Sequence, residues 1–285
     1  MKKISFLLTL FVGLVFVSCQ KVDVTFPYAE MDTNNAELRV LNVMPYTENS
    51  DTLWLSGVRY SMVATKVGGY YPNSTPRYFS MPLGNNNVML NFLPKIDPVT
   101  KAVITPAWVY KGVISNLQKG KWSAYVYDKT KDPIMLQDSD YLPNFDQWKD
   151  TVCFVRFSNF FLKKDGVTPF GNLTLKIKKN ITGAAWETVA TSVPFGTQSA
   201  YYKYKLKNTT NTYPWTGSEA NITIAVWDDG GNQLQQFNAS GVLSAFSVPS
   251  LTLGKGRAYV FYMNGKQGTT NSSDQYIRLS SFNVK

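Results

Sequence analysis

Four acidic residues near the middle of the chain could do carboxylate chemistry: Asp138, Asp140, Asp146 and Asp150. Two carboxylates about 5–10 Å apart could hydrolyse a glycosidic bond, and the same oxygens could bind Ca²⁺. However, the spacing is not that of an EF-hand, and Pro143 interrupts the segment. We therefore interpret the segment as a solvated acidic loop. A carboxylate-based hydrolase is a third functional hypothesis, which requires two of these acids to converge in a cleft.

Cys153 is a second residue with chemical potential, in the apolar segment TVCFVRF (151–157). A catalytic thiolate needs a nearby base or cation that lowers its pKa. The chain has no His, which excludes Ser-His-Asp and Cys-His arrangements, and two cysteines cannot complete a zinc site alone. We expect Cys153 to be a buried, inert thiol in a central strand. No catalytic residue, metal or cofactor is predicted, and the chain is predicted not to be an enzyme.

Aromatic side chains in loops are the candidates for ligand binding. Sugars present flat C–H faces that stack on aromatic rings, and loops carry function on rigid sandwiches. The aromatic residues in Pro-, Gly- or Asn-rich contexts are Tyr70, Tyr71, Tyr78, Trp108, Tyr213 and Trp215. We predict that they bind a glycan or peptide; the alternative is that their rings close the loops onto the core. Trp54, Trp122 and Trp227 lie in strand-like segments and are expected in the core.

The basic residues are scattered along the chain, although its formal net charge is +10. A nucleic-acid-binding protein concentrates them on one stripe, so no nucleic-acid partner is predicted. In YYKYKLK (201–207) lysines alternate with aromatic and aliphatic residues. On a strand the lysines would take one face, where they are solvated and discourage edge pairing. The alternative is a basic face for acidic glycans or nucleic acid.

The elements that must position these residues are predicted to be β-strands. Aromatic residues, 14% of the 285 residues, favour strands, and the length suits two domains. Helical periodicity is absent after the leader. Segments that alternate as strands do are 36–43, 51–56, 87–92 and 121–128. DDGGN (228–232) is typical of a hairpin turn, in which Asp228 and Asp229 are structural.

The strand pattern then starts again in the second half of the chain. Three pairs of segments match in the same order, namely 36–45 with 151–160, 50–57 with 171–179, and 117–127 with 251–262. Within the first pair Arg39 matches Arg156 and Asn42 matches Asn159. The preserved order indicates a tandem duplication in which each copy forms one immunoglobulin-like sandwich.

The N-terminus predicts export and a lipid anchor. Lys2 and Lys3 precede an apolar run, residues 4–17, that is shorter than the ~20 residues of a membrane-spanning helix and fits a signal peptide. The sequence FVSC (16–19) resembles a bacterial lipobox, which implies cleavage before Cys19 and its acylation. The alternative is an ordinary signal peptide with an incidental cysteine. Residues 20–23 resemble a weak version of the surface-export tail of Bacteroidota lipoproteins.

Several motifs of the two copies resemble domain of unknown function 4397. RVLN (39–42) and VRFSN (155–159) open strands, and VPFGTQSAYY (193–202) and GRAYVFY (256–262) fit the second copy. VGGYY (67–71) fits the first copy only in part. The resemblance covers most of the mature chain. It implies an immunoglobulin-like β-sandwich on an exported protein, often a lipoprotein, and it supplies no catalytic residues.

The sequence therefore predicts an all-β chain with two tandem immunoglobulin-like antiparallel β-sandwich domains. The predicted parts are a lipoprotein signal peptide (1–18), a lipidated N-terminus and tether (19–35), sandwich 1 (36–142), a linker (143–149) and sandwich 2 (150–285). We expect a cell-surface lipoprotein of the outer membrane, held by a lipid on Cys19, that captures a glycan or peptide beside a SusC/SusD-like, TonB-dependent importer. The alternative is an adhesion or structural cell-envelope protein that contacts other envelope proteins.

Overall fold

The computed structural model describes most of the chain after residue 33. The described residues are 34–45, 50–61, 69–71, 78–138, 152–179, 181–206, 218–238, 240–268 and 276–283. They form strands and turns without a helix, which confirms the all-β prediction, and none of them belongs to a helix that could cross a bilayer. The predicted leader, Cys19 and the predicted linker 143–149 lie outside the described residues.

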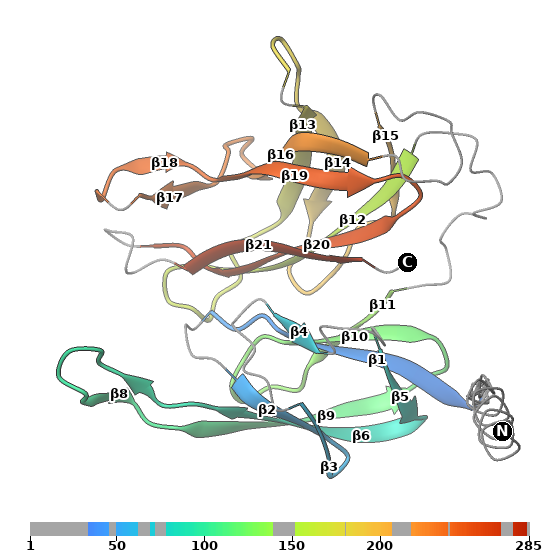
Figure 1. Cartoon of the computed structure of the whole chain (residues 1–285), viewed down its shortest axis with the longest axis vertical. Helices are drawn as coiled ribbons and strands as arrows, with labels where there is room; N and C mark the ends of the chain where they lie inside the picture. Colours follow the sequence, from blue (N-terminus) through green and yellow to red (C-terminus); the bar gives the residue numbers. More distant parts are fainter. Residues whose placement is uncertain are drawn as a thin grey trace, which may run out of the picture. The chain divides into compact units, whose positions relative to one another are not determined.

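The first half of the chain forms two sheets and a separate hairpin (Figure 1). Its strands are β1 (Asn35–Asn42), β2 (Ser50–Leu55), β3 (Val58–Ser61), β4 (Tyr70–Tyr71), β5 (Phe79–Pro82), β6 (Gly84–Phe92), β7 (Lys95–Ile96), β8 (Val103–Thr105), β9 (Trp108–Leu117), β10 (Lys121–Val126) and β11 (Ile134–Gln137). The outer sheet has the order β3-β2-β6-β9. The inner sheet has the order β11-β10-β1-β4, and β5 also pairs with β1.

The second half has the same arrangement. Its strands are β12 (Val152–Leu162), β13 (Leu173–Lys179), β14 (Glu187–Val193), β15 (Tyr202–Lys205), β16 (Ser218–Asp228), β17 (Gln235–Phe237), β18 (Leu243–Ala245), β19 (Ser247–Gly254), β20 (Ala258–Lys266) and β21 (Tyr276–Asn283). The outer sheet has the order β14-β13-β16-β19, and the inner sheet has the order β15-β12-β20-β21.

The two halves repeat one topology strand by strand. In each half the first strand pairs in parallel with the penultimate strand, β1 with β10 and β12 with β20, while the other pairs are antiparallel. In each half a two-stranded hairpin is inserted at the same place, β7–β8 between β6 and β9 and β17–β18 between β16 and β19. The three sequence matches fall on equivalent strands, which agrees with a tandem duplication. The predicted domain boundaries stay predictions, because residues 139–151 lie outside the described part.

Alternation of side chains places the first strand of each half between two apolar layers. In β12, Cys153, Val155 and Phe157 point into the core of the second half, while Phe154 and Phe160 point to the opposite face. Both faces are buried, so the strand is apolar almost throughout, as is usual for a strand covered on both sides. Cys153 is fully buried between β15 and β20, which confirms its prediction as a buried thiol of a central strand.

A third apolar core lies where the two inner sheets face each other. Leu41, Val43 and Tyr125 of the first half pack there with Phe160 and Tyr262 of the second half. The rings of Tyr125 and Phe160 stack with their centroids 4.3 Å apart. Domains joined by a small polar interface usually move relative to each other, whereas a large apolar one restricts that motion. The two sandwiches therefore share a buried apolar junction.

Two local predictions have different outcomes. On β15, Tyr204 is buried while Lys203 and Lys205 are exposed, so the predicted amphipathic edge strand is confirmed. The prediction that three tryptophans belong to the core holds only in part. Trp122 packs against the core of the first half. Trp227 is also buried, and its ring packs against Trp186. Trp54 is half-buried and lies between two core residues of β2, on the outer face of that strand.

Candidate functional site

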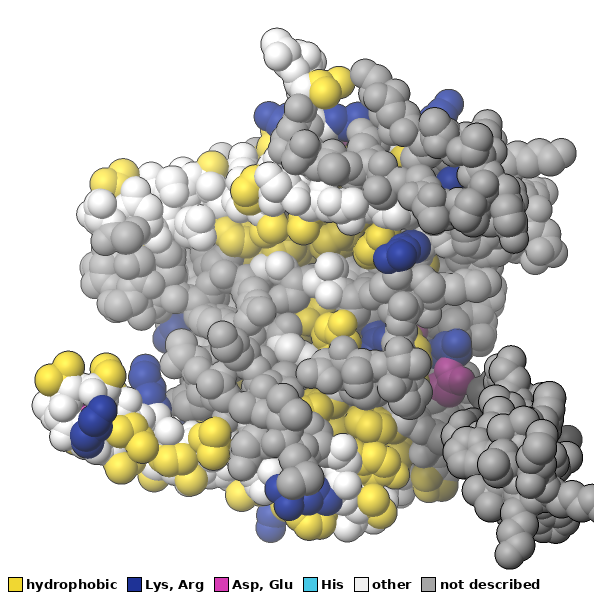
Figure 2. Space-filling view, viewed as in Figure 1, with side chains coloured by type: hydrophobic (Ala, Val, Ile, Leu, Met, Phe, Trp, Pro, Cys, Tyr) yellow, Lys and Arg dark blue, Asp and Glu magenta, His cyan; other side chains and the backbone are white. Residues whose placement is uncertain are grey.

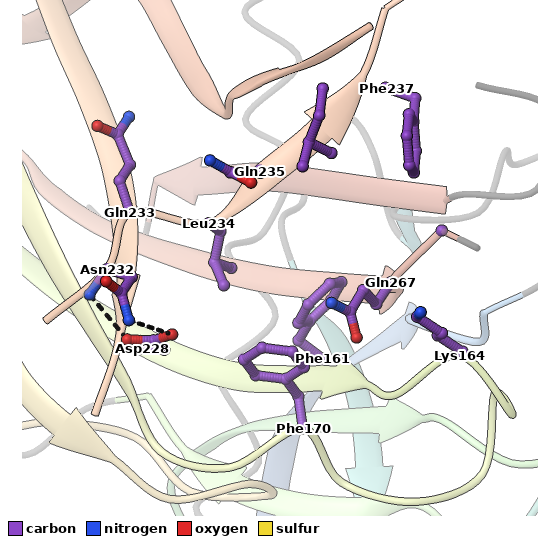
Figure 3. A pocket seen from close by; sticks show the side chains of 12 residues that line it. Phe161, Lys164, Phe170, Asp228, Asn232, Gln233, Leu234, Gln235, Phe237 and Gln267 are labelled. Atoms are coloured by element: carbon purple, nitrogen blue, oxygen red, sulfur yellow. Dashed lines mark hydrogen bonds between the residues drawn. The ribbon is translucent and has the colours of Figure 1, made fainter. Parts of the chain in front are cut away.

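A hollow of about 400 Å³ opens below the β17–β18 hairpin of the second half (Figure 3). This volume lies at the lower end of the range, roughly 300–1,000 Å³, that is typical of small-ligand pockets. Its floor is apolar and consists of Phe161, Phe170 and Leu234, with Phe237 at one side. Its walls come from the end of β12, the loop that follows β12, the β17–β18 hairpin and the segment after β20.

The aromatic floor is held in place by a short closed loop. Phe161 ends the buried stretch of β12, and its ring lies 5.2 Å from that of Phe170, at an angle of 50°. Between them the chain turns back, because Asp165 accepts hydrogen bonds from the backbone N–H groups of Val167 and Thr168. The Thr168 hydroxyl and these N–H groups lower the pKa of Asp165 to about 2. The loop thus carries Phe170 and Lys164 to the hollow at defined positions.

The one carboxylate of the hollow is engaged in its own turn. Asp228 accepts hydrogen bonds from the backbone N–H of Asn232, at 2.8 Å, and from its side-chain amide. Gly231 adopts a positive φ of 77° in this turn, which glycine tolerates without strain. Asp229 accepts a hydrogen bond from the Ser192 hydroxyl. The predicted structural role of Asp228 and Asp229 in a hairpin turn is confirmed.

Amides and one ammonium are the remaining polar groups of the hollow. The Gln233 amide donates to the backbone carbonyl of Phe246. Within the described part of the chain, the side-chain amides of Gln235 and Gln267 and the ammonium of Lys164 make no hydrogen bond or ion pair. They border the hollow from different segments (Figure 3). The amides of Gln235 and Gln267 can both donate and accept hydrogen bonds, so together with the apolar floor they can bind a ligand.

Tyr71 and Tyr78 are not exposed, which favours the stated alternative that their rings close onto the core. Tyr71, on β4, packs in the core of the first half, and the buried Tyr78 ring packs against the Arg39 guanidinium. The Tyr71 hydroxyl donates to the backbone carbonyl of Ser50, and the Tyr78 hydroxyl donates to Asp138. Tyr70 is half-buried, and the Arg39 guanidinium lies 5.1 Å from its ring centroid. Tyr71 and Tyr78 thus serve the fold, whereas part of Tyr70 stays exposed. Tyr213 and Trp215 lie outside the described residues.

Trp108 is half-buried and already has partners on its ring. Phe92, its partner across the β6–β9 pair, stacks on it with the ring centroids 3.9 Å apart and the planes nearly parallel. The Lys129 ammonium lies 4.4 Å from the ring centroid. Neighbouring side chains therefore occupy the surface on which a sugar would stack.

Asp138 is a correction to the predicted solvated acidic loop. The chain leaves β11 directly into the junction, so the carboxylate is fully buried. One carboxylate oxygen accepts hydrogen bonds from the Ser123 hydroxyl, at 2.5 Å, and the Tyr78 hydroxyl, at 3.1 Å. Burial raises the pKa of Asp138 to about 6, although Ser123, Arg39, Tyr78 and Arg156 oppose the rise. Asp140, Asp146 and Asp150 lie outside the described residues.

The two arginines matched by the duplication lie at this same junction. The Arg39 guanidinium lies 4.4 Å from the Tyr78 ring centroid, and that of Arg156 lies 4.0 Å from the Tyr201 ring centroid. Arg156 also donates to the backbone carbonyl of Gln137, and the Tyr201 hydroxyl donates to the backbone carbonyl of Asp138. Among the described residues no group of three His, Cys, Asp or Glu side chains could hold a metal ion. We assign these residues to the junction between the halves.

The β7–β8 arm, residues 93–107, carries a third surface feature that sequence reasoning missed. Its aliphatic side chains are exposed, Val99 by 86%. The others in and beside the arm are Leu93, Ile96, Val103, Ile104 and Val109. Figure 2 shows yellow hydrophobic side chains over this arm at the lower left, with dark blue Lys or Arg side chains beside them. The signal in the sequence is a segment rich in β-branched residues that is interrupted by Pro94, Pro98 and Pro106.

Comparison with known proteins places the chain near no characterised family. No family model matches it, and no curated protein is similar enough in sequence to be a relative. Several solved structures align with it at low similarity, among them the following three. A candidate cell adhesion protein from Bacteroides uniformis is 10% identical with a TM-score of 0.24, and the alignment covers 87% of this chain and 96% of that chain.

The other two are fimbrial or pilus proteins. The tip fimbrial protein Mfa3 from Porphyromonas gingivalis is 9% identical with a TM-score of 0.22, covering 87% of this chain and 99% of that chain. A streptococcal ancillary pilin is 15% identical with a TM-score of 0.18, covering 79% of this chain and 60% of that chain. TM-scores this low do not establish a shared fold, so the architecture and the proposals below rest on the structure itself.

Proposed function

We propose that this chain is a non-catalytic cell-envelope protein that makes adhesive or structural contacts with another protein through the β7–β8 arm. The observation that carries the proposal is the exposed aliphatic surface of this arm. Soluble proteins rarely expose a contiguous apolar area of this kind unless it meets a partner.

The charges of the arm define the partner's chemistry. Asp97 accepts hydrogen bonds from the backbone N–H groups of Val99 and Thr100, so its carboxylate is engaged in the turn. Lys95 and Lys101 add positive charge beside the aliphatic side chains. A matching partner surface has an apolar centre and an acidic rim, since opposite charges guide association and set its orientation.

The remaining parts of the chain support this role. The predicted lipid on Cys19 would hold the protein at the outer membrane, facing the exterior, because several acyl chains anchor a soluble domain stably. The apolar junction between the inner sheets joins the two sandwiches. Force applied to the β7–β8 arm would then be transmitted through the apolar junction to both sandwiches.

A crosslinking experiment on intact cells tests the proposal. A photo-crosslinking residue at position 99 is expected to give one discrete protein adduct. The same residue at position 58, where Val58 is also exposed but lies on β3, is expected to give none. A double variant, Val99→Ser with Ile104→Ser, should reduce both the adduct and the retention of protein-coated beads on isolated envelopes by about tenfold, as expected for the core of an interface. Equal yields at the two positions, or unchanged retention, would contradict the proposal.

Nutrient capture beside an importer is a second candidate, favoured by the amide-bordered hollow of Figure 3. It predicts that the lipidated protein co-purifies from native membranes with a TonB-dependent importer and is sensitive to protease in intact cells. Isolation without an importer, together with the crosslink at position 99, would leave adhesion as the function.

A further inference from the structure

We propose that the hollow below the β17–β18 hairpin binds a short saccharide that carries a carboxylate, such as a uronic acid unit. This site is separate from the β7–β8 arm, so its test does not depend on the function proposed above.

The floor of the hollow fits the apolar side of a sugar ring. Phe170 is half-buried and packs on the fully buried Phe161, so a rigid aromatic layer lies below the open space. Leu234 is held by β-type hydrogen bonds of its backbone to Val226 and Phe246 and adds an aliphatic contact. The volume of about 400 Å³ suits one or two sugar units, because a larger ligand would extend into solvent.

The walls fit hydroxyl groups. A hydroxyl both donates and accepts hydrogen bonds, and a carboxamide offers the same two functions. The amides of Gln235 and Gln267 approach from the hairpin and from the segment after β20, so they face a rounded ligand from different directions (Figure 3). An extended peptide would instead require a row of main-chain partners along one strand edge. The geometry therefore favours a sugar over a peptide strand.

The charge at the hollow selects an acidic sugar. Asp228 is engaged by Asn232. Lys164 is exposed at the border and has no ion pair among the described residues. An ammonium and a carboxylate form a charge-assisted hydrogen bond, which is stronger than a neutral one. The net charge of +10 also raises the local concentration of anionic ligands.

The chain offers matched controls for each contact. Gln235 borders the hollow, whereas Gln236, its neighbour on β17, does not. Lys164 borders it, whereas the adjacent, equally exposed Lys163 does not. All four residues are at the surface, or nearly so, and substitutions there should leave the fold intact.

The test is isothermal titration of the folded protein with a galacturonic acid disaccharide and with its uncharged galactose counterpart. We expect saturable binding of the acidic sugar. Gln235→Ala should weaken it about fivefold through a lost hydrogen bond, and Lys164→Gln about tenfold through a lost charged one. Gln236→Ala and Lys163→Gln should change the affinity less than about twofold. Circular dichroism of each variant confirms the fold.

Three results would overturn the inference. The first is absence of saturable binding of the acidic disaccharide. The second is equal affinity for the charged and uncharged sugars, since Lys164 would then play no part. The third is an equal effect of the control and test variants, or saturable binding of extended peptides alone. A negative result here leaves the crosslink at position 99 unaffected, so the two proposals fail independently.

Discussion

The β7–β8 and β17–β18 hairpins occupy the same place in the repeated topology (Figure 1) but differ in the side chains that they carry. The first exposes Ile96, Val103 and Ile104. The second carries Gln235 beside an apolar hollow and exposes Val242 and Leu243 near its turn. Neither hairpin pairs with the sheets of its sandwich, so its side chains are free to differ without cost to the core. The two sandwiches thus share one topology, whereas the hairpins inserted in them differ in their side chains.

The buried frame shows the opposite behaviour. Asn42 and Asn159 are both fully buried, and the carbonyl oxygen of each side chain accepts the backbone N–H two residues later, from Met44 and Phe161. Asn159 donates in addition to the backbone carbonyls of Gly171 and Val193. The same side chain thus closes the same local turn in both halves and makes further bonds in the second half.

The largest expected effect comes from removing this asparagine in the second half. Asn159→Ala deletes three hydrogen bonds and leaves buried backbone groups without partners, so we expect the free energy of unfolding to fall by about 4 kcal/mol. Asn42→Ala deletes one long bond and should cost about 1 kcal/mol. Urea unfolding measures both. Equal losses in the free energy of unfolding would contradict the conclusion that Asn159 contributes more to stability than Asn42.

The junction between the halves should make stability depend on pH. Burial raises the pKa of Asp138 from 3.8 to about 6, so the carboxyl binds a proton more readily in the folded protein than in the unfolded chain. The free energy of unfolding should therefore rise as the pH falls from about 6 to about 4, by up to about 3 kcal/mol. Ser123, Tyr78, Arg39 and Arg156 face the carboxylate and limit the rise.

Asp138→Asn provides the control for this pH dependence. The amide does not titrate, so the variant should lack the rise between pH 6 and pH 4 while the other carboxylates titrate as before. Thermal or urea unfolding at several pH values compares the two proteins. If the free energy of unfolding of the wild-type protein does not rise relative to that of the variant as the pH falls from 6 to 4, the raised pKa of Asp138 is contradicted.

The two hairpins should differ in their affinity for an apolar dye. Replacing Val99 and Ile104 by Ser should reduce the fluorescence of a bound hydrophobic dye, because these side chains are the exposed apolar surface. The free energy of unfolding should change by less than about 0.5 kcal/mol, as is usual at the surface. The double change Val242→Ser with Leu243→Ser is the matched variant in the other hairpin and should reduce the fluorescence less. The reverse order would remove the distinction between the hairpins.

Only a small effect is expected at the buried Cys153, whose counterpart in the first half is Ala36. Both are fully buried at the same position of the first strand. Cys153→Ala should therefore destabilise the protein by only about 1 kcal/mol, the cost of a small cavity. In a Cys19→Ser protein the Cys153 thiol should react with a thiol reagent only after unfolding. Rapid reaction in the folded protein would show an accessible thiol.

The repeat and its strands could be predicted because alternation, turn residues and the order of matching segments are local properties. The DDGGN turn and the amphipathic strand at Lys203 and Lys205 follow from such patterns. The burial of Tyr78 and Asp138 could not be predicted, because it depends on which faces of the inner sheets meet. Tyr71 packs in the core of the first half, which the short segment around it does not reveal. An acidic residue just beyond a strand reads as solvated until a second sheet covers it.

The hollow could not be predicted from sequence patterns either. Phe161, Phe170, Leu234 and Gln267 come together only through the tertiary fold and share no motif. The exposed aliphatic arm did carry a signal, a β-branched run among prolines. A strand-like run predicts pairing and burial by default, so its exposure became visible only once the sheets were complete.

The apolar core shared by the inner sheets also decides how the protein folds. An isolated half would expose Leu41, Val43 and Tyr125, or Phe160 and Tyr262, to water as one sheet face. Each sandwich is thus incomplete as a folding unit, and heating should melt both in a single cooperative transition rather than two. Two separated calorimetric peaks would show otherwise. We therefore expect the unfolding of the two halves to be coupled, so that a destabilising substitution in either half unfolds both.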